Sequence, residues 1–157
     1  MINAFFWNIR GVARAPNLRR FRKLVRLHDV KFLAISKPKQ PICNVDHIRM
    51  RLLFDSVLVN PSKNLWVFFS SPFICSIVSS SAQHITLSIY HPWLSGLLFF
   101  SFVHAKCTME ERRELWHHLL RDKPNASPWC IGGDFNVVTT PHEKCGGRPY
   151  SMAEGNF

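Results

Sequence analysis

The sequence predicts one domain of mixed α/β class, and two observations carry this prediction. Short runs of apolar, aromatic and β-branched residues alternate with polar loops, which is typical of strands. Two other segments place apolar residues at helical spacing. A chain of 157 residues has room for one domain of ordinary size. Its 46% hydrophobic residues make it too apolar for a disordered polycation, although its formal charge is +10.

The first part of the chain reads as strand, helix, strand. Ala4 to Trp7 is a short apolar run that meets the flexible Gly11, as a strand entering a loop does. Residues 17–26 carry apolar side chains at helical spacing, and Asn17 is the expected N-cap. Residues 32–35 predict the next strand, which ends before Pro38 because proline disfavours helical geometry in the residue ahead of it.

The middle of the chain predicts several hairpin-linked strands, and a helix and a strand follow. The strands are expected over residues 57–59, 65–69, 73–78, 84–90 and 97–103. Thr108 and Glu111 have the spacing of a capping box, which predicts the start of a helix. The buried stripe of that helix is expected to consist of Leu115, Trp116, Leu119 and Leu120. Residues 129–131 predict a last short strand.

The net positive charge comes entirely from the first part of the sequence. Residues 1–64 hold 13 Lys and Arg against 3 Asp and Glu, residues 65–103 hold none of either, and residues 104–157 hold 7 of each. A positive lobe suits a polyanion such as nucleic acid, but a solvated basic surface explains it equally well. For the basic residues at 19–26 we prefer the solvated helix face over dedicated phosphate contacts.

Cysteine usage and hydropathy indicate an intracellular protein that is neither secreted nor inserted in a membrane. The five cysteines are odd in number and include no CxxC pair, which argues against a disulfide framework and against structural zinc. No secretory signal is visible. Polar residues and prolines interrupt the uncharged stretch at 65–103, so no run reaches the roughly 18 apolar residues of a membrane helix.

Four polar residues each follow an apolar run that predicts a strand: Asn8, Lys37, His104 and Asp134. Loops at the carboxyl ends of neighbouring strands converge in α/β folds, and this is where such folds place their sites. Asp134 and Asn136 are two residues apart, so an extended chain would project both to one side. Taken alone, the Gly-Gly-Asp-Phe-Asn segment at 132–136 is more typical of a turn.

Four motifs, taken in order, resemble the endonuclease/exonuclease/phosphatase superfamily. They are Trp7-Asn8-Ile9-Arg10-Gly11 before a basic helix, the strand at 32–36 with Pro38-Lys39, the strand at 101–103 before a Glu-Arg-Arg-rich helix, and the segment at 132–136. The resemblance is closest to the endonuclease domains of plant LINE-type non-LTR retrotransposons, and it covers almost the whole chain. It implies a single domain over residues 1–157 with a deoxyribonuclease-I-like fold: a four-layer α/β sandwich with two packed mixed sheets, here incomplete because its C-terminal part is truncated.

The resemblance also implies a function and roles for particular residues. Enzymes of this superfamily are Mg²⁺-dependent phosphodiesterases or phosphatases, so the implied cofactor is Mg²⁺ and the implied partner is DNA or another phosphodiester. Asn8 would bind metal and phosphate, Asp134 would orient or deprotonate the attacking water, and Asn136 would support Asp134. His104 occupies the position of a family Tyr. Weaker nucleic-acid contacts are expected from Arg10, Arg14, Arg19 and Arg22.

The chain departs from the family pattern in three ways. Lys37 stands where the family has its metal-binding Glu, and an ammonium group cannot ligate Mg²⁺. His104 replaces the Tyr, and the late Asp and His of the family have no counterpart after Asp134; we expect His142 to be a surface residue. We therefore expect no efficient hydrolysis. Lys37 is expected to form a salt bridge with Asp134.

Three hypotheses follow. The leading one is a degenerate, retrotransposon-derived endonuclease-like domain whose ancestral reaction is Mg²⁺-dependent cleavage of DNA; the nucleus is its compartment by family analogy. The second is an active phosphodiesterase or phosphatase of the same superfamily, in which Asp46 or Asp55 replaces the missing carboxylate. The third is a basic nucleic-acid-binding module without catalysis that uses Arg10, Arg14 and the cluster at 19–26. Whether the chain is an enzyme is left open among them.

Overall fold

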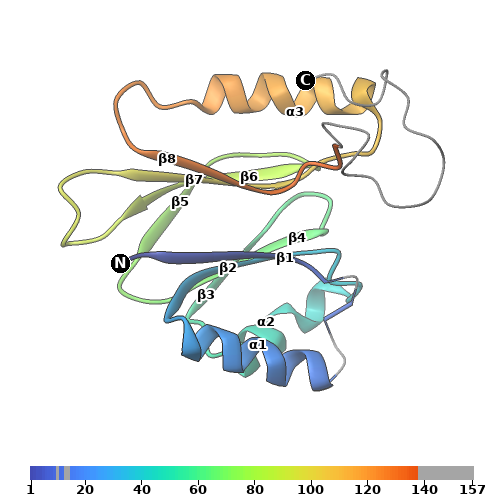
Figure 1. Cartoon of the computed structure of the whole chain (residues 1–157), viewed down its shortest axis with the longest axis vertical. Coiled ribbons are helices and arrows are strands. Elements are labelled where there is room, and N and C mark those ends of the chain that lie inside the picture. Colours follow the sequence, from blue (N-terminus) through green and yellow to red (C-terminus); the bar gives the residue numbers. More distant parts are fainter. Residues whose placement is uncertain (10, 13–14, 138–157) are drawn as a thin grey trace, which may run out of the picture.

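The computed structural model describes residues 1–9, 11–12 and 15–137, which form two four-stranded sheets with helices on their outer faces (Figure 1). The first sheet has the order β1-β2-β4-β3 and contains β1 (Asn3–Asn8), β2 (Val30–Ser36), β3 (Ser56–Val59) and β4 (Leu65–Phe69). The second has the order β5-β6-β7-β8 and contains β5 (Ile74–Ser80), β6 (His84–Tyr90), β7 (Leu98–His104) and β8 (Trp129–Asp134). The helices are α1 (Ala15–Leu27), the 3₁₀ turn η1 (Ile42–Asn44), α2 (Val45–Leu52) and α3 (Met109–Asp122).

The elements stack in four layers. Helices α1 and α2 cover the outer face of the first sheet, the two sheets pack face to face, and α3 covers the second sheet (Figure 1). Strand pairs β1/β2 and β7/β8 are parallel and the other pairs are antiparallel, so both sheets are mixed. The predicted sandwich of two packed mixed sheets is confirmed.

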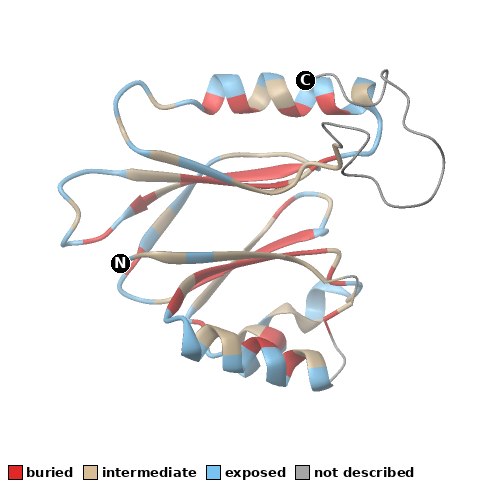
Figure 2. Cartoon of the chain, viewed as in Figure 1, coloured by how far each residue is buried: buried red, intermediate tan, exposed pale blue. Residues whose placement is uncertain are grey.

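Apolar side chains fill all three interfaces between the layers. Strand β4 contributes to two of these interfaces, which explains why its sequence is apolar throughout. Leu65, Val67 and Phe69 face the second sheet, whereas Trp66 and Phe68 face α1 and α2. Successive residues of a strand point to opposite faces, so a strand with both faces covered is apolar at every position. All five residues of β4 are accordingly buried (Figure 2).

The first helix begins earlier than expected, and a second helix was not predicted. Helix α1 begins at Ala15, so the predicted N-cap at Asn17 is wrong; Asn17 lies inside the helix and its Nδ2 donates to the Gly11 carbonyl at 3.1 Å. Helix α2 escaped prediction because it is short and buries only Ile48 and Leu52, too few for a recognisable periodicity.

The capping box of α3 forms in a modified way. Thr108 Oγ1 accepts from the Glu111 backbone N–H at 3.3 Å, as predicted. The Glu111 carboxylate, however, accepts from the Thr108 hydroxyl at 2.7 Å instead of from its backbone N–H. The prediction that Leu120 belongs to the buried stripe is wrong, because that side chain is 71% exposed and Arg112 lies buried beneath the helix instead.

None of the helices within the described residues has both the length and the apolar character needed to cross a membrane. Cys43, Cys75, Cys107 and Cys130 are free thiols. The remaining cysteine, Cys145, lies outside the described residues.

Candidate functional site

Polar side chains from both sheets meet at the carboxyl ends of β1, β7 and β8. Asn8, His104 and Asp134 are the last residues of these three strands. Asn8 Nδ2 donates to Asp134 Oδ2 at 2.6 Å, and His104 Nδ1 lies 4.0 Å from the same oxygen. Strand β1 is the edge of its sheet and β8 the edge of the other, and the two contact each other across the sandwich. The cluster therefore exists only because the sheets pack face to face.

Gly133 allows β8 to lie close enough to β7 to place Asp134 in the cluster. Gly133 pairs with Val103 and Asp134 with His104 in the parallel ladder. The Gly133 φ is 155°, and a Cβ atom there would lie 2.0 Å from the Val103 carbonyl oxygen. Only glycine has no side chain at this position, so it is the residue that permits this approach.

Asn136 holds the Asp134 carboxylate through a turn. Its φ is 48°, its backbone N–H donates to Asp134 Oδ1 at 3.1 Å, and its Nδ2 donates to the Ala105 carbonyl at 2.5 Å. Of the two alternatives, the turn that the residue types favoured forms, and the extended arrangement with both side chains on one side does not. An Asp side chain that accepts from the N–H two residues later forms a compact turn, which positions Asn136 and the carboxylate together.

Arg112 positions this turn, and the sequence analysis missed it. Its Nη1 donates to the carbonyls of Lys106 at 3.3 Å, Cys107 at 2.6 Å and Asn136 at 3.1 Å. The side chain thereby joins α3 to the loops that follow β7 and β8. A signal was present in the sequence, because Arg112 precedes the buried Leu115 by three residues and so falls on the inward face of the helix.

Three buried polar atoms at this end of the sheets have no hydrogen-bond partner among the described residues: Asn8 Oδ1, Ser36 Oγ and His104 Nδ1. Asn8 and Ser36 are neighbours across the β1/β2 ladder. A buried polar atom left unsatisfied costs about 1–3 kcal/mol, so several of them together indicate where atoms of a ligand bind. The cluster is therefore the candidate binding site.

Lys37 brings a positive charge to this site. It follows Ser36 directly, is half-buried and has a φ of 53°. Burial lowers the pKa of His104, and the nearby Lys37 ammonium lowers it further against the opposing effect of Asp134. No ion pair within 4.0 Å joins Lys37 to Asp134 in the described part of the chain, so the predicted direct salt bridge is wrong. Asp134 takes its hydrogen bonds from Asn8 and Asn136 instead.

The residues at the site do not fit a tightly bound Mg²⁺ ion. The cluster offers one carboxylate, both of whose oxygens already accept hydrogen bonds, and one free amide oxygen, Asn8 Oδ1. Mg²⁺ requires a near-octahedral set of oxygen ligands, and an adjacent ammonium repels it. Within residues 1–9, 11–12 and 15–137, no group of three or more His, Cys, Asp or Glu is placed to hold a metal ion.

The two carboxylates considered as substitutes for the missing Glu are engaged elsewhere. Asp46 Oδ1 accepts from Arg49 Nε at 3.0 Å on the exposed side of α2. Asp55 Oδ2 accepts from the Ser71 backbone N–H at 2.7 Å. Asp55 precedes β3 at the end of the first sheet that holds the start of β2, whereas the candidate site lies at the other end.

Two of the expected nucleic-acid contacts, Arg19 and Arg22, are not part of this cluster. Arg19 and Arg22 lie exposed on α1, where they line a separate hollow. Arg10, Arg14 and His142 lie outside the described residues.

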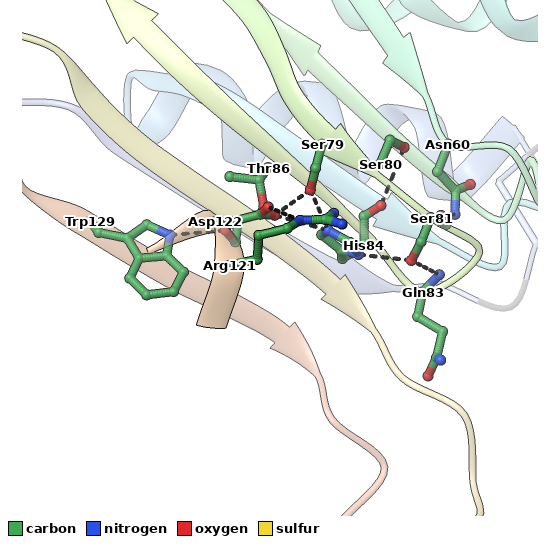
Figure 3. Close-up of polar contacts among 11 residues, drawn as sticks. Asn60, Ser79, Ser80, Ser81, Gln83, His84, Thr86, Arg121, Asp122 and Trp129 are labelled. Carbon is green, nitrogen blue, oxygen red and sulfur yellow. Dashed lines mark hydrogen bonds and ion pairs between the residues drawn. The ribbon is translucent and has the colours of Figure 1, made fainter. Parts of the chain in front are cut away.

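A second polar network lies buried between the second sheet and α3 (Figure 3). His84 is fully buried; its Nδ1 is 2.8 Å from Ser81 Oγ and its Nε2 is 3.2 Å from Asp122 Oδ2, which also accepts from Ser79 Oγ. Burial lowers the pKa of His84 although Asp122 opposes the shift. Burial raises the pKa of Asp122, but hydrogen bonds from Ser79, Thr86 and His84 outweigh this and lower it. The network joins the end of α3 to β5 and β6.

The chain has the fold of endonuclease/exonuclease/phosphatase structures. Its two packed mixed sheets lie between helical layers, and polar residues gather at the carboxyl ends of β1, β7 and β8. Among the structures with this fold is the endonuclease domain of TRAS1, a telomere-specific non-LTR retrotransposon, with a TM-score of 0.63 and 10% identity over 90% of this chain. A superfamily protein from Bacteroides thetaiotaomicron has a TM-score of 0.61 and 13% identity over 88% of the chain, and TDP2 from Caenorhabditis elegans has 0.50 and 16% over 91%.

The likeness to these structures is one of fold, and their sequences are only 10–16% identical to this chain. The chain covers 62% of the TRAS1 domain, 65% of the Bacteroides protein and 48% of TDP2. No family model and no curated protein matches its sequence.

Proposed function

We propose that this chain is a degenerate, retrotransposon-derived domain of the endonuclease/exonuclease/phosphatase type, which binds a DNA phosphodiester and hydrolyses it poorly. Its ancestral reaction is Mg²⁺-dependent cleavage of DNA. The observation that carries the proposal is Lys37, whose ammonium lies near enough to lower the pKa of His104, while Asn8, Asp134 and Asn136 keep a connected arrangement. The motif resemblance aligns Lys37 with the family's metal-binding Glu. The retrotransposon origin is supported by the motif resemblance and by the shared fold with the TRAS1 domain.

The chemistry of these residues favours binding over hydrolysis. The Lys37 ammonium and the imidazole of His104 can donate to phosphate oxygens, and Asp134 can accept a proton from water. In the family, a divalent ion stabilises the charge that develops on the phosphate during attack. A single ammonium is a weaker substitute for a divalent ion at this step. We therefore expect phosphate contact with little turnover.

A cleavage assay on supercoiled plasmid with increasing Mg²⁺ tests this proposal, with a phosphomonoester as second substrate. We expect the wild type to cleave neither substrate faster than Asp134→Ala does. Lys37→Glu restores a carboxylate and should raise both Mg²⁺ affinity, measured by calorimetry, and Mg²⁺-dependent nicking. Lys39→Glu is the matched control, because it changes the same charge at an exposed residue two positions away.

The outcomes separate the hypotheses. Mg²⁺-dependent nicking by the wild type that Asp134→Ala abolishes would overturn the proposal in favour of an active phosphodiesterase. A Lys37→Glu variant that binds Mg²⁺ no better than Lys39→Glu would show that Lys37 does not occupy the ligand position.

A further inference from the structure

Helix α1 carries five basic residues and no acidic one: Arg19, Arg20, Arg22, Lys23 and Arg26. All five are exposed. Its apolar residues Leu18 and Phe21 pack against the first sheet, so the basic residues lie on the outer surface of the sandwich. None of the five forms an ion pair within the part of the chain that the structure describes.

Four of these cations surround one hollow. Arg19, Arg22, Lys23 and Arg26 line an open depression of about 540 Å³ together with Leu27. At 100° per residue these four fall within an arc of about 100° on the helix. Arg20 lies outside this arc and lines a different hollow with Trp7, Asn17 and Phe21. We call Arg19, Arg22, Lys23 and Arg26 the basic stripe.

The basic stripe matches the charge spacing of a nucleic-acid backbone. Arg19 and Arg26 are seven residues apart, which is about 10 Å along a helix. One strand of duplex DNA presents a phosphate about every 3.4 Å of helix axis, so the stripe spans roughly three phosphate steps. Like charges held this close repel one another, and a polyanion relieves this repulsion while releasing its own counterions.

The lining of the hollow favours a duplex over a single strand. Sites for single strands combine cations with aromatic side chains on which bases stack. Among the described residues that line the hollow beside the basic stripe there is no aromatic one, and Leu27 is the one apolar member. A duplex presents phosphates while its bases remain stacked inside, which suits a purely cationic surface.

We propose that the basic stripe of α1 is a second nucleic-acid site, which binds the phosphate backbone of duplex DNA without sequence preference. It is separate from the cluster at Asn8 and Asp134, and it requires no metal ion. The identity of the polyanion as DNA rests on the proposed function. The stripe narrows the basic cluster at 19–26 to the four residues that line one hollow and excludes Arg20.

Fluorescence anisotropy with a labelled 20-base-pair duplex in EDTA tests the proposal on the full chain. Each phosphate contact contributes about −0.9 to the slope of log K against log salt, so four contacts give about −3.6. The association constant should therefore fall about 150-fold between 50 and 200 mM salt. The double variant Arg22→Ala/Arg26→Ala should flatten the slope by about 1.8, and Arg22→Lys/Arg26→Lys should preserve it.

The control Arg20→Ala/Arg113→Ala removes the same charge from two exposed residues outside the stripe. Urea midpoints measured on every variant separate lost binding from lost folding. A control that flattens the slope as much as the stripe variant would overturn the proposal in favour of net charge alone. Equal or tighter binding of a 20-base single strand would overturn the assignment to duplex.

The outcome of this binding test is independent of the outcome of the cleavage test of the proposed function. EDTA excludes metal-dependent cleavage, so the stripe is tested by the salt slopes of its own variants, whereas the proposed function is tested by Mg²⁺-dependent nicking. A wild type that proved active on plasmid would refute the proposed loss of hydrolysis without altering the salt slopes.

Discussion

Arg112 should contribute more to the free energy of unfolding than any exposed arginine of the same helix. Its side chain is 1% exposed and donates to three backbone carbonyls, those of Lys106, Cys107 and Asn136. A hydrogen bond from a charged donor contributes about 1.5–3 kcal/mol, and the cost of burying the guanidinium offsets part of the sum. We expect Arg112→Ala to lower the free energy of unfolding by about 3–4 kcal/mol, a large part of the 5–15 kcal/mol typical of a domain.

Urea denaturation followed by tryptophan fluorescence measures this loss. Arg113→Ala is the matched control, because Arg113 is the next residue of α3 and is exposed; its loss should stay within about 0.5 kcal/mol. Arg112→Lys keeps the charge but not the forked donor geometry, so it should recover only part of the stability. A loss below about 1 kcal/mol for Arg112→Ala, no larger than that of Arg113→Ala, would refute the positioning role derived from these contacts.

Two further predictions concern the β7/β8 ladder and the network beneath α3. Gly133→Ala should lower the free energy of unfolding by about 3 kcal/mol or more, which is the order of strained-backbone substitutions. Gly132→Ala should be tolerated, because its Cβ would meet nothing within 4 Å. Equal urea midpoints for the two variants would contradict the close approach of Gly133 to Val103. The folded state lowers the pKa of His84 below its ordinary value of 6.5, so the stabilisation from its neutral form is present above pH 6.5 and is lost as the pH falls through the folded value. The free energy of unfolding should therefore fall between pH 7.5 and pH 5 more steeply in the wild type than in His84→Gln, and parallel pH profiles would exclude His84 as the cause.

Local patterns were sufficient to locate most strands, because the apolar residues of a strand show which of its faces are covered. Residues 65–69 and 84–90 were predicted with the bounds that the structure has, and both strands are largely buried. The polar residues at the ends of the strands could also be located from the sequence, because Asn8 and Asp134 each follow the apolar run that forms the strand. Helix α2 was missed because its few buried residues leave no periodic pattern.

The contacts within the candidate site were harder to foresee. The Asn8–Asp134 hydrogen bond joins residues 126 positions apart on different sheets, and no local pattern contains that distance. A turn at Asn136 was favoured by the residue types, but its contacts with Asp134 and Ala105 were not foreseen, and Arg112 took the buried place expected for Leu120. The direct pair of Lys37 with Asp134 does not form, and the carboxylate accepts from Asn8 and Asn136 instead.

By itself, the sequence determined the class of fold and the confinement of net positive charge to the first 64 residues, since both are properties of residue types in order. Only the tertiary structure decided which donors reach Asp134, which guanidinium is buried under α3 and which arginines of α1 share one hollow. Sequence order specifies what a side chain can do, whereas the packing of two sheets and the rotation of a helix decide which side chains meet.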